Sequence, residues 1–487
     1  MQGIVERIER FARERPGGPA LTDGQVCLDY QELCGEIHRV AATLYLRRIG
    51  LLLENGCAWA VLDLAALHQR AVCVPMPTFF SDDQLRHLIR DSGVEVIFTD
   101  QPERLLKLVE APHVVDSVVA GQRLSCFIIM PETTPPLPST ITKITYTSGS
   151  TGQPKGVSLT ADAILRVTAS LVTAVGATPA DKAITVLPLS TLLANIAGVY
   201  APLYCGGVAC LPPPERCGLL GSTGVDVDRF VETLRRNRPS VTVLVPHLLK
   251  TLIEAGEAKL PLPTSLRHIA VGGAPLSGQL LQRGQTLGLP VYQGYGLSEA
   301  ASVVSLNLPG ADRPGSVGRP LPHVNVRIAN DGEILVGGDL FSGYLGRSTP
   351  QSREWPTGDI GHFDADGYLY VTGRKKTAFA TAHGRNVAPE WIESELTSIP
   401  AIAQAALFGE GRNANIAIVV PRNAAAATRI GPVIGALNRT LPDYARVNRW
   451  IIADEPFSAH NGLANGAGVL NRQAIAARYW DRIEQAH

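Results

Sequence analysis

Short apolar runs rich in β-branched residues alternate with segments of helical periodicity through most of the chain. A short apolar run between turn residues is typical of a buried strand, and the amphipathic segments between such runs predict helices. The alternation indicates βαβ units, and therefore a mainly parallel sheet with helices on its faces. The predicted strands are 72–75, 94–99, 184–188, 241–246 and 268–271, and the predicted helices include 83–92 and 227–237.

The pattern changes after Gly318, where short predicted strands are separated by turn sequences such as Asn330-Asp331-Gly332. Such turns are typical of hairpins and predict a small antiparallel sheet or barrel after the α/β part. The remaining segment is long enough for a small α+β domain. We predict an α/β fold with a large N-terminal domain, 1–375, and a small C-terminal domain, 376–487. The strands expected in these parts are 324–329, 333–336, 361–363, 368–371, 403–408 and 416–420, and the expected helix is 390–397.

Composition excludes some functions. Apolar residues make up 45% of the 487 residues and charged residues 18%, as in globular chains with more than one packed unit. Lys+Arg and Asp+Glu each number 44, which does not favour a nucleic acid or an anionic membrane as partner. The eight cysteines lack zinc-ligand spacing and are expected to be reduced. Pro188 and Pro202 interrupt the longest apolar stretch, and the N-terminus does not resemble a signal peptide, so we expect a cytoplasmic protein without a membrane span.

The strongest chemical signal is a loop that follows a predicted strand, 141–146, and precedes a helix beginning near Ala161. Its sequence from 147 to 157 is TSGSTGQPKGV. Glycines allow the backbone to approach a ligand closely, and N–H and hydroxyl groups can converge on phosphate oxygens. The GxxxxGK[ST] pattern is absent, so a P-loop NTPase is not indicated. The candidate phosphate-binding residues are Thr147, Ser148, Gly149, Ser150, Thr151, Gly152 and Lys155.

This loop resembles the phosphate-binding signature of the adenylate-forming superfamily, and the motif character is closest to that of acyl-CoA synthetases. Two further segments match in order, 272–276 and 293–299. The resemblance implies that the first segment lies beside adenine, and that Tyr295 contacts adenine, Ser298 the α-phosphate and Glu299 a magnesium ion. Mg²⁺ commonly shares hard oxygen ligands with substrate phosphates, which suits a glutamate. The implied nucleotide-binding residues are Gly272, Gly273, Ala274, Gln293, Gly294, Tyr295 and Gly296.

The same resemblance extends to the junction of the two predicted domains. It implies that Asp359 and Arg374 bind the ribose, that Lys376 is the hinge, and that the loop with Gly384 meets a pantetheine arm. Family enzymes rotate the small domain between an adenylating and a thioester-forming arrangement, so the small domain is expected to be mobile. The implied ligands are ATP, Mg²⁺, and coenzyme A or a phosphopantetheine group as acceptor.

One position departs from the family. A lysine near the end of the chain normally reaches the substrate carboxylate and the α-phosphate, but Val469 stands at that place and Lys376 is the last lysine. Loss of such a donor slows reactions by on the order of 10²–10³-fold. Three explanations remain open. Arg472 or Arg478 could supply the charge, the enzyme could adenylate slowly or receive a preformed acyl-adenylate, or the protein could have kept only ligand binding.

The acid pocket of the family corresponds to residues 187–198. This stretch holds no acidic residue that could bind an ammonium group, which argues against an α-amino acid. Its apolar character favours a fatty or an aryl acid. The candidate pocket residues are Ser190, Thr191, Asn195 and His247, although a lone histidine beside an apolar run is more often a core residue.

The expected function is ATP-dependent activation of an apolar acid, followed by transfer to the thiol of coenzyme A or of a carrier protein. A weakened or transfer-only member is the alternative, as is a member that uses a non-thiol acceptor.

Overall fold

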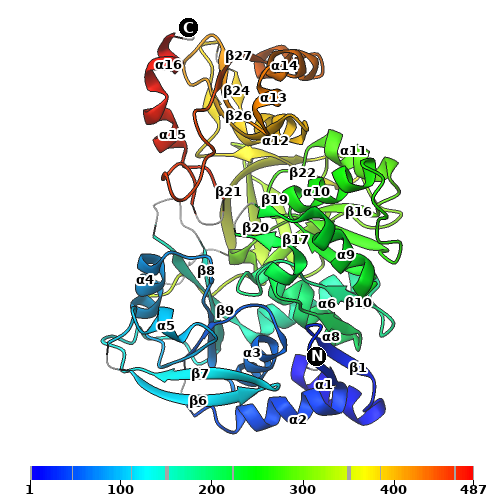
Figure 1. The fold of residues 1–487 in the computed structure, drawn as a ribbon, viewed down its shortest axis with the longest axis vertical. Coiled ribbons are helices and arrows are strands. Elements are labelled where there is room, and N and C mark those ends of the chain that lie inside the picture. The colour runs from blue at the N-terminus through cyan, green and yellow to red at the C-terminus, as the bar shows by residue number, and fades with distance from the viewer. Residues whose placement is uncertain are drawn as a thin grey trace.

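The structure is a computed structural model that describes residues 3–45, 48–110, 112–147, 153–221, 224–347, 353–383, 385–465 and 468–485. A large domain holds the chain as far as β22, and a smaller domain containing α12 to α16 lies above it in Figure 1. The predicted fold class is confirmed. The boundary between residues 375 and 376 stays a prediction.

The first sheet of the large domain has nine strands, and its centre is parallel. These central strands are largely apolar, since they are buried under helices. Residues of α6, α9, α10 and α11 belong to the hydrophobic clusters that include the strands. The antiparallel partners β2, β17 and β18 lie toward its two edges. The strand order is β18 (Arg319–Pro320), β17 (Ser302–Leu306), β16 (Val291–Leu297), β15 (His268–Val271), β14 (Val241–Leu244), β10 (Lys182–Ile184), β11 (Val208–Cys210), β1 (Pro19–Thr22) and β2 (Cys27–Asp29).

The second sheet has seven strands and carries the loop that resembles the phosphate-binding signature. That loop joins β8 to β9, which pair in antiparallel fashion. The outer hairpin of β6 and β7 was not predicted from the sequence. The strand order is β6 (His113–Val119), β7 (Gln122–Ile128), β5 (Val96–Thr99), β3 (Arg48–Leu52), β4 (Val72–Pro75), β8 (Ile141–Thr147) and β9 (Lys155–Thr160).

The strand predicted at 184–188 is wrong in most of its length, because β10 ends at Ile184. From Leu187 to Leu189 the backbone is bound by a side chain instead of a neighbouring strand. Asn55 Nδ2 donates to Leu187 O at 2.9 Å, and Leu189 N donates to Asn55 Oδ1 at 2.8 Å. An apolar run therefore continues where the strand does not.

The predicted small antiparallel sheet follows, and the small domain contains a further sheet with one antiparallel and one parallel strand pair. The small domain packs its sheet against α12 and α14 on one side and α15 and α16 on the other. The first sheet consists of β19 (Val324–Ile328), β20 (Glu333–Gly338), β21 (Glu354–Phe363) and β22 (Leu369–Arg374), and the second of β25 (Ile402–Phe408), β26 (Asn415–Pro421) and β27 (Val447–Ile452). The two-residue pairs are β12 (Leu219–Leu220) with β13 (Gly224–Val225), and β23 (Phe379–Ala380) with β24 (Asn386–Val387).

Several helices begin at residues that satisfy their first N–H groups. Asp29 and Ser81 form capping boxes with Glu32 and Gln84. Within the described residues no helix combines the length and the apolarity that crossing a membrane requires. The helices are α1 (Ile4–Glu14), α2 (Tyr30–Ala41), α3 (Cys57–Gln69), α4 (Asp82–Ser92), α5 (Pro102–Leu105), α6 (Ala161–Val175), α7 (Leu192–Asn195), a π-helix (Ile196–Tyr200), α8 (Ala201–Cys205), α9 (Val227–Asn237), α10 (Pro246–Glu257), α11 (Gly278–Thr286), α12 (Pro389–Ser398), α13 (Ala424–Ala427), α14 (Ile430–Asn438), α15 (Arg472–Arg478) and α16 (Trp480–Gln485).

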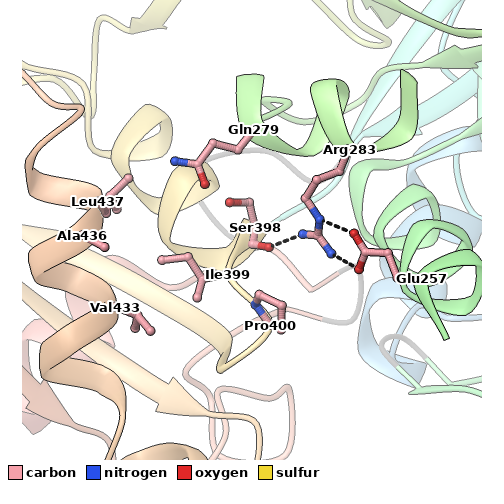
Figure 2. A pocket seen from close by; sticks show the side chains of 9 residues that line it. All are labelled: Glu257, Gln279, Arg283, Ser398, Ile399, Pro400, Val433, Ala436 and Leu437. Atoms are coloured by element: carbon pink, nitrogen blue, oxygen red, sulfur yellow. Dashed lines mark hydrogen bonds and ion pairs between the residues drawn. The ribbon is translucent and has the colours of Figure 1, made fainter. Parts of the chain in front are cut away.

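The two domains meet where α10 and α11 face α12. A cleft of about 420 Å³ remains at this interface (Figure 2). The residues that line it come from α10, α11, α12 and α14 and from the turn after α12: Glu257, Gln279, Arg283, Ser398, Ile399, Pro400, Val433, Ala436 and Leu437.

Candidate functional site

The β8–β9 pair brings two predicted site residues together. Thr147 is the last residue of β8, and it pairs with Lys155, the first residue of β9. Both are half-buried. Lys155 Nζ lies 5.6 Å from the centre of the Tyr344 ring, within the range of a cation–π contact. The other residues predicted to bind phosphate lie outside the described residues: Ser148, Gly149, Ser150, Thr151 and Gly152.

Tyr344 also connects Lys155 to the candidate magnesium ligand. The Tyr344 hydroxyl donates to Glu299 Oε1 at 2.7 Å. Burial and the Glu299 carboxylate both raise the pKa of Tyr344, so its hydroxyl stays a neutral donor. Sequence reasoning missed this residue. Its only signal was an aromatic residue in a glycine-containing loop, Phe341 to Gly346, which is common in proteins.

The backbone around Ser298 and Glu299 adopts an unusual conformation. They lie in a single 3₁₀ turn, Ser298–Ala300, that follows β16, and the two residues after this turn, Ala301 and Ser302, have φ of 55° and 108°. Non-glycine residues with positive φ are uncommon and cluster at functional sites. A Cβ on Gly296 would lie 1.7 Å from Ser302 O, so the motif requires glycine there. The turn therefore fixes the direction of the Glu299 side chain.

Tyr295, Asp359 and Arg374 form the best defined cluster of the site. The Tyr295 hydroxyl donates to Asp359 Oδ2 at 2.6 Å, and Arg374 Nε lies 2.9 Å from Asp359 Oδ1. Asp359 and Arg374 are direct partners across β21 and β22, so the sheet register sets their separation. Asp359 is 3% exposed, whereas the Arg374 side chain is 63% exposed. The cluster thus presents a fixed carboxylate beside an accessible guanidinium.

Two opposing influences act on the Asp359 carboxyl. Burial raises its pKa, and the carboxylates of Glu390 and Glu299 act in the same direction. Arg374 and the Tyr295 hydroxyl lower it. Burial and Asp359 likewise raise the pKa of Tyr295, which keeps this phenol a hydrogen-bond donor.

The segment predicted to lie beside adenine is the loop between β15 and α11. Gly273 has a φ of +81°, which favours glycine, and both Gly273 and Ala274 are exposed. A Cβ on Gly272 would lie 3.3 Å from Gly294 O, so the loop passes close to β16. Gln293 pairs with Val271 across the two strands. The loop and the Tyr295–Glu299 segment therefore lie together at the carboxyl ends of neighbouring parallel strands, where ligands of open α/β sheets bind.

The candidate acid-pocket residues are placed differently from one another. Asn195 is buried, and both ends of its amide are used inside the protein. Its Oδ1 accepts from Lys143 Nζ at 2.5 Å, and its Nδ2 donates to Asp63 Oδ2 at 2.9 Å. Ser190 is buried, and the Thr191 hydroxyl donates to Pro188 O at 2.8 Å. These contacts leave Asn195 a structural role in the core.

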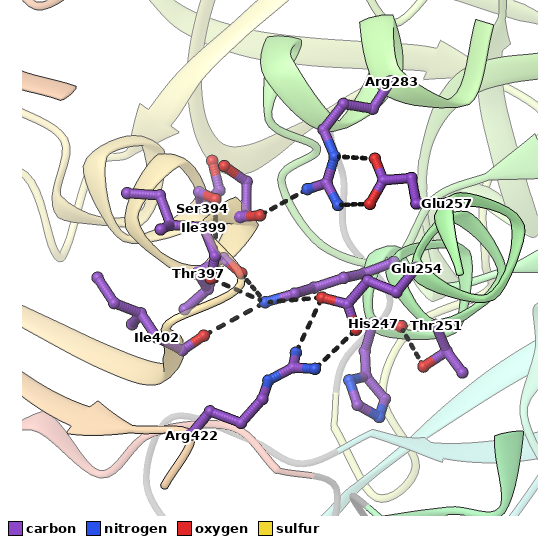
Figure 3. A network of polar contacts seen from close by, with 12 residues as sticks. His247, Thr251, Glu254, Glu257, Arg283, Ser394, Thr397, Ile399, Ile402 and Arg422 are labelled. Atoms are coloured by element: carbon purple, nitrogen blue, oxygen red, sulfur yellow. Dashed lines mark hydrogen bonds and ion pairs between the residues drawn. The ribbon is translucent and has the colours of Figure 1, made fainter. Parts of the chain in front are cut away.

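His247 is exposed on the first turn of α10, near the domain interface and beside Glu254 and Arg422 (Figure 3). Its assignment to an acid pocket stays a prediction.

The end of the chain that should carry a lysine offers a valine in a tight turn. Val469 is 58% exposed, and Asn465 binds it twice, through Asn465 N to Val469 O and Val469 N to Asn465 Oδ1, each at 2.9 Å. Arg472 Nη2 lies 2.5 Å from Glu393 Oε2 and 3.5 Å from Glu390 Oε1. Arg478 Nη2 lies 2.5 Å from Glu455 Oε1. Both arginines are thus already paired with carboxylates.

Two further predicted residues, the hinge Lys376 and Gly384 of the predicted pantetheine loop, remain to be placed. Lys376 is exposed in the turn after β22. Gly384 lies outside the described residues.

Comparisons with known proteins agree with this architecture. The model of the AMP-binding enzyme family matches residues 8–345, and that of the AMP-binding enzyme C-terminal domain matches residues 377–487. The chain therefore belongs to the AMP-binding enzyme family, which confirms the resemblance to the adenylate-forming superfamily.

Curated relatives include long-chain-fatty-acid–CoA ligase FadD15 of Mycobacterium bovis, 29% identical over 73% of this chain and 69% of the relative. Indoleacetate–CoA ligase of Aromatoleum aromaticum is 27% identical over 86% of this chain and 88% of its own. The predicted enzyme class, an AMP-forming acid–thiol ligase, is confirmed.

Solved structures share the fold across both domains. The anthranilate CoA ligase AuaEII in complex with anthranoyl-AMP superposes with a TM-score of 0.79 at 19% identity, covering 98% of this chain and 97% of that chain. The o-succinylbenzoate CoA synthetase MenE of Bacillus subtilis, in complex with OSB-AMP, gives 0.77 at 23% identity, covering 97% and 98%.

Proposed function

We propose that the protein activates an apolar carboxylic acid with ATP and transfers the acyl group to the thiol of coenzyme A. In the first half-reaction a carboxylate oxygen of the acid attacks the α-phosphorus of ATP, and pyrophosphate leaves. In the second half-reaction the thiol sulfur attacks the acyl carbon, its proton is lost, and AMP leaves. The observation that carries the proposal is the Asp359 cluster, a carboxylate fixed by Tyr295 and Arg374.

This cluster suits a nucleoside. A carboxylate accepts hydrogen bonds from two neighbouring hydroxyl groups, as a ribose provides, and the exposed Arg374 guanidinium is a donor to ribose or phosphate oxygens. Thr147 and Lys155 place a hydroxyl and a cation at the start and end of the glycine-rich loop. Ser298 is the candidate donor to the α-phosphate. The ligand-bound relatives support this assignment, since one is in complex with anthranoyl-AMP and the other with OSB-AMP.

Glu299 is the candidate ligand for Mg²⁺. Within the described part of the chain its Oε1 accepts the Tyr344 hydroxyl, and its Oε2 makes no hydrogen bond or ion pair, so a hard oxygen is available to a cation. The ion would neutralise charge on the phosphates of ATP. A MenE structure that contains ATP and a magnesium ion supports this choice.

A fatty or an aryl acid is the proposed substrate. The segment 187–198 holds no carboxylate that could bind an ammonium group, and the relatives are named for long-chain fatty acids, indoleacetate and ferulate. Coenzyme A is the proposed acceptor because the relatives are CoA ligases. A carrier-protein phosphopantetheine presents the same thiol and is an outcome of the test.

The test is product formation with Mg·ATP, a panel of fatty and aryl acids, and separate acceptors, followed by mass spectrometry. We expect an acyl-CoA thioester with at least one apolar acid. An acyl-amine or acyl-ester product without a thioester would contradict the choice of acceptor. A thioester formed only from synthetic acyl-adenylate, with no reaction from ATP and acid, would instead establish the transfer-only alternative to which Val469 points.

A further inference from the structure

The two domains cap each other's helices across their interface, beside the cleft of Figure 2 and within the network of Figure 3. The helices are α10 and α11 of the large domain and α12 of the small domain. We call the participating side chains the interdomain clasp: Lys250, Glu254, Ser277, Arg283, Glu395 and Arg422.

Lys250 and Arg283 cap the carboxyl end of α12. Lys250 Nζ donates to Thr397 O, and also to Ile399 O at 3.3 Å and Ile402 O at 3.2 Å. Arg283 donates to Ser398 O at 2.8 Å. The last carbonyls of a helix lack partners within the helix and carry partial negative charge, so cations stabilise this end.

Burial lowers the pKa of Lys250 to about 8, against the opposing effect of Glu254, so the ammonium is still charged at neutral pH. A buried cation with these contacts is held by carbonyl oxygens of the other domain. Its removal would leave those oxygens without their partner.

Glu395 performs the converse role at the amino end of α11. Its Oε2 accepts from Ser277 Oγ at 2.9 Å, and its Oε1 accepts from Gly278 N at 3.2 Å. Ser277 is the N-cap residue of α11, and a carboxylate is favourable at this end of a helix. Residues 272–276, the loop assigned to the adenine side, lead directly into Ser277. The small domain is therefore bonded to the end of a nucleotide-site loop.

A third contact completes the clasp. Arg422 of the small domain forms two hydrogen bonds with Glu254, at 2.7 and 3.0 Å. The Arg422 side chain is half-exposed, and the cleft of about 420 Å³ shows that the interface is not closely packed nearby. Polar caps beside a cleft, unlike a continuous apolar interface, can be broken without exposing much apolar surface.

The orientation held by the clasp directs one segment of the small domain to the site. A Cβ on Gly373, beside Arg374, would lie 2.4 Å from the Cβ of Ala388, so the segment before α12 packs against β22. Glu390, in the first turn of α12, raises the pKa of the Asp359 carboxyl. The orientation of the small domain therefore acts directly on the Asp359 cluster.

We propose that Lys250 and Glu395 are positioning residues that hold the small domain in the observed arrangement and so set the balance between the two half-reactions. The inference rests on the proposed function, because only an enzyme with two half-reactions has this balance. It assigns no contact with substrate to either residue.

The test uses the full-length protein with Lys250→Met and Glu395→Ala combined, and Lys107→Met as a matched control on an exposed lysine far from the interface. Two rates are measured. One is pyrophosphate exchange with dodecanoate and benzoate, and the other is thioester formation from synthetic dodecanoyl- and benzoyl-adenylate with coenzyme A. We expect the ratio of the two rates to change about tenfold, because loss of several charge-assisted hydrogen bonds shifts a two-state equilibrium by that order. An equal fall in both rates, or no change in their ratio, would overturn the proposal.

Hydrogen–deuterium exchange separates failure of the clasp from failure of the proposed function. The double variant should exchange faster in residues 277–281 and 397–402 than the parent protein or the control, whether or not any acid is activated. Unchanged protection there would overturn the clasp. Glu395→Gln, which keeps the volume and one acceptor oxygen, should change both readouts in the same direction by less, so a folding defect of the double variant would not hide the result.

Discussion

The two ends of the candidate site differ in how their charged groups are held. At the large-domain end, the buried Asp359 carboxylate is fixed by Tyr295 and faces the accessible guanidinium of Arg374. At the small-domain end, Val469 occupies the exposed turn, and Arg472 is bound to Glu393 inside the domain. The groups expected to bind the nucleotide are thus already in position, whereas the adenylation step lacks the lysine that the family normally supplies. Nucleotide affinity and the rate of adenylation can therefore change independently in this chain.

Removal of Arg472 should give the largest effect, and it should be on stability. Arg472→Met leaves Glu393, which is 8% exposed, without its cation, and breaking a buried pair from one side costs about 3–5 kcal/mol. Chemical unfolding measures this change. Arg478→Met is the matched control, because its pair with Glu455 is half-exposed and should contribute less than about 1 kcal/mol. If Arg472→Met kept its stability but lost pyrophosphate exchange, Arg472 would be the missing cation.

Loss of the carboxylate charge at Glu299 should slow the reaction next most strongly. Glu299→Gln keeps the acceptor for Tyr344 but weakens the ligand for Mg²⁺, and we expect exchange to fall by on the order of 10²–10³-fold. The magnesium concentration that gives half-maximal exchange should rise. Glu232→Gln, on the exposed face of α9, serves as control. A variant with the same magnesium dependence as the parent protein would contradict this role.

A lysine at position 469 should restore a cation to the small-domain end of the candidate site. Val469→Lys places an ammonium in the exposed turn, and we expect pyrophosphate exchange to rise by about tenfold or more, since such donors contribute on the order of 10²–10³ in rate. Val469→Met has similar length without charge and should leave the rate near that of the parent protein. Equal rates for the lysine and methionine variants would show that charge at this turn does not limit the reaction.

Acid should weaken the large domain beneath the nucleotide site. His268 on β15 is fully buried, burial lowers its pKa to about 4, and within the described residues neither ring nitrogen has a hydrogen-bond partner. A histidine with a lowered pKa contributes stability above its unfolded pKa of about 6.5, and that stability is lost as pH falls toward about 4. The contribution is at most about 3 kcal/mol. Between pH 7 and 4 the free energy of unfolding should depend less on pH in His268→Phe than in the parent protein. The same pH dependence in both proteins would contradict this role of His268.

Much of the fold could be predicted because its strands are continuous apolar runs. The predicted boundaries of β4, β15 and α9 agree with the structure. The strand at 184–188 failed because the apolar pattern does not reveal that Asn55, far away in the sequence, binds the backbone there. Local periodicity describes burial, but it does not identify hydrogen-bond partners.

The candidate site shows the same limit. Tyr295, Asp359 and Arg374 were found because they lie in recognisable motifs, and the structure brings them together. Tyr344 was missed because it lies in a short loop without a distinctive spacing. Asn195 was assigned to a pocket because its segment corresponds to the acid pocket of the family. Its hydrogen-bond partners, Lys143 and Asp63, come from distant parts of the chain, and no local pattern could have shown that its amide binds inside the core.

The most direct measurement is acid-dependent pyrophosphate exchange of the parent protein with Mg·ATP and a panel of fatty and aryl acids. We expect exchange above background with at least one apolar acid, at a rate that Val469→Lys increases. A folded protein that binds ATP but shows no exchange with any acid, with or without the added lysine, would contradict the central claim that this chain forms acyl-adenylates.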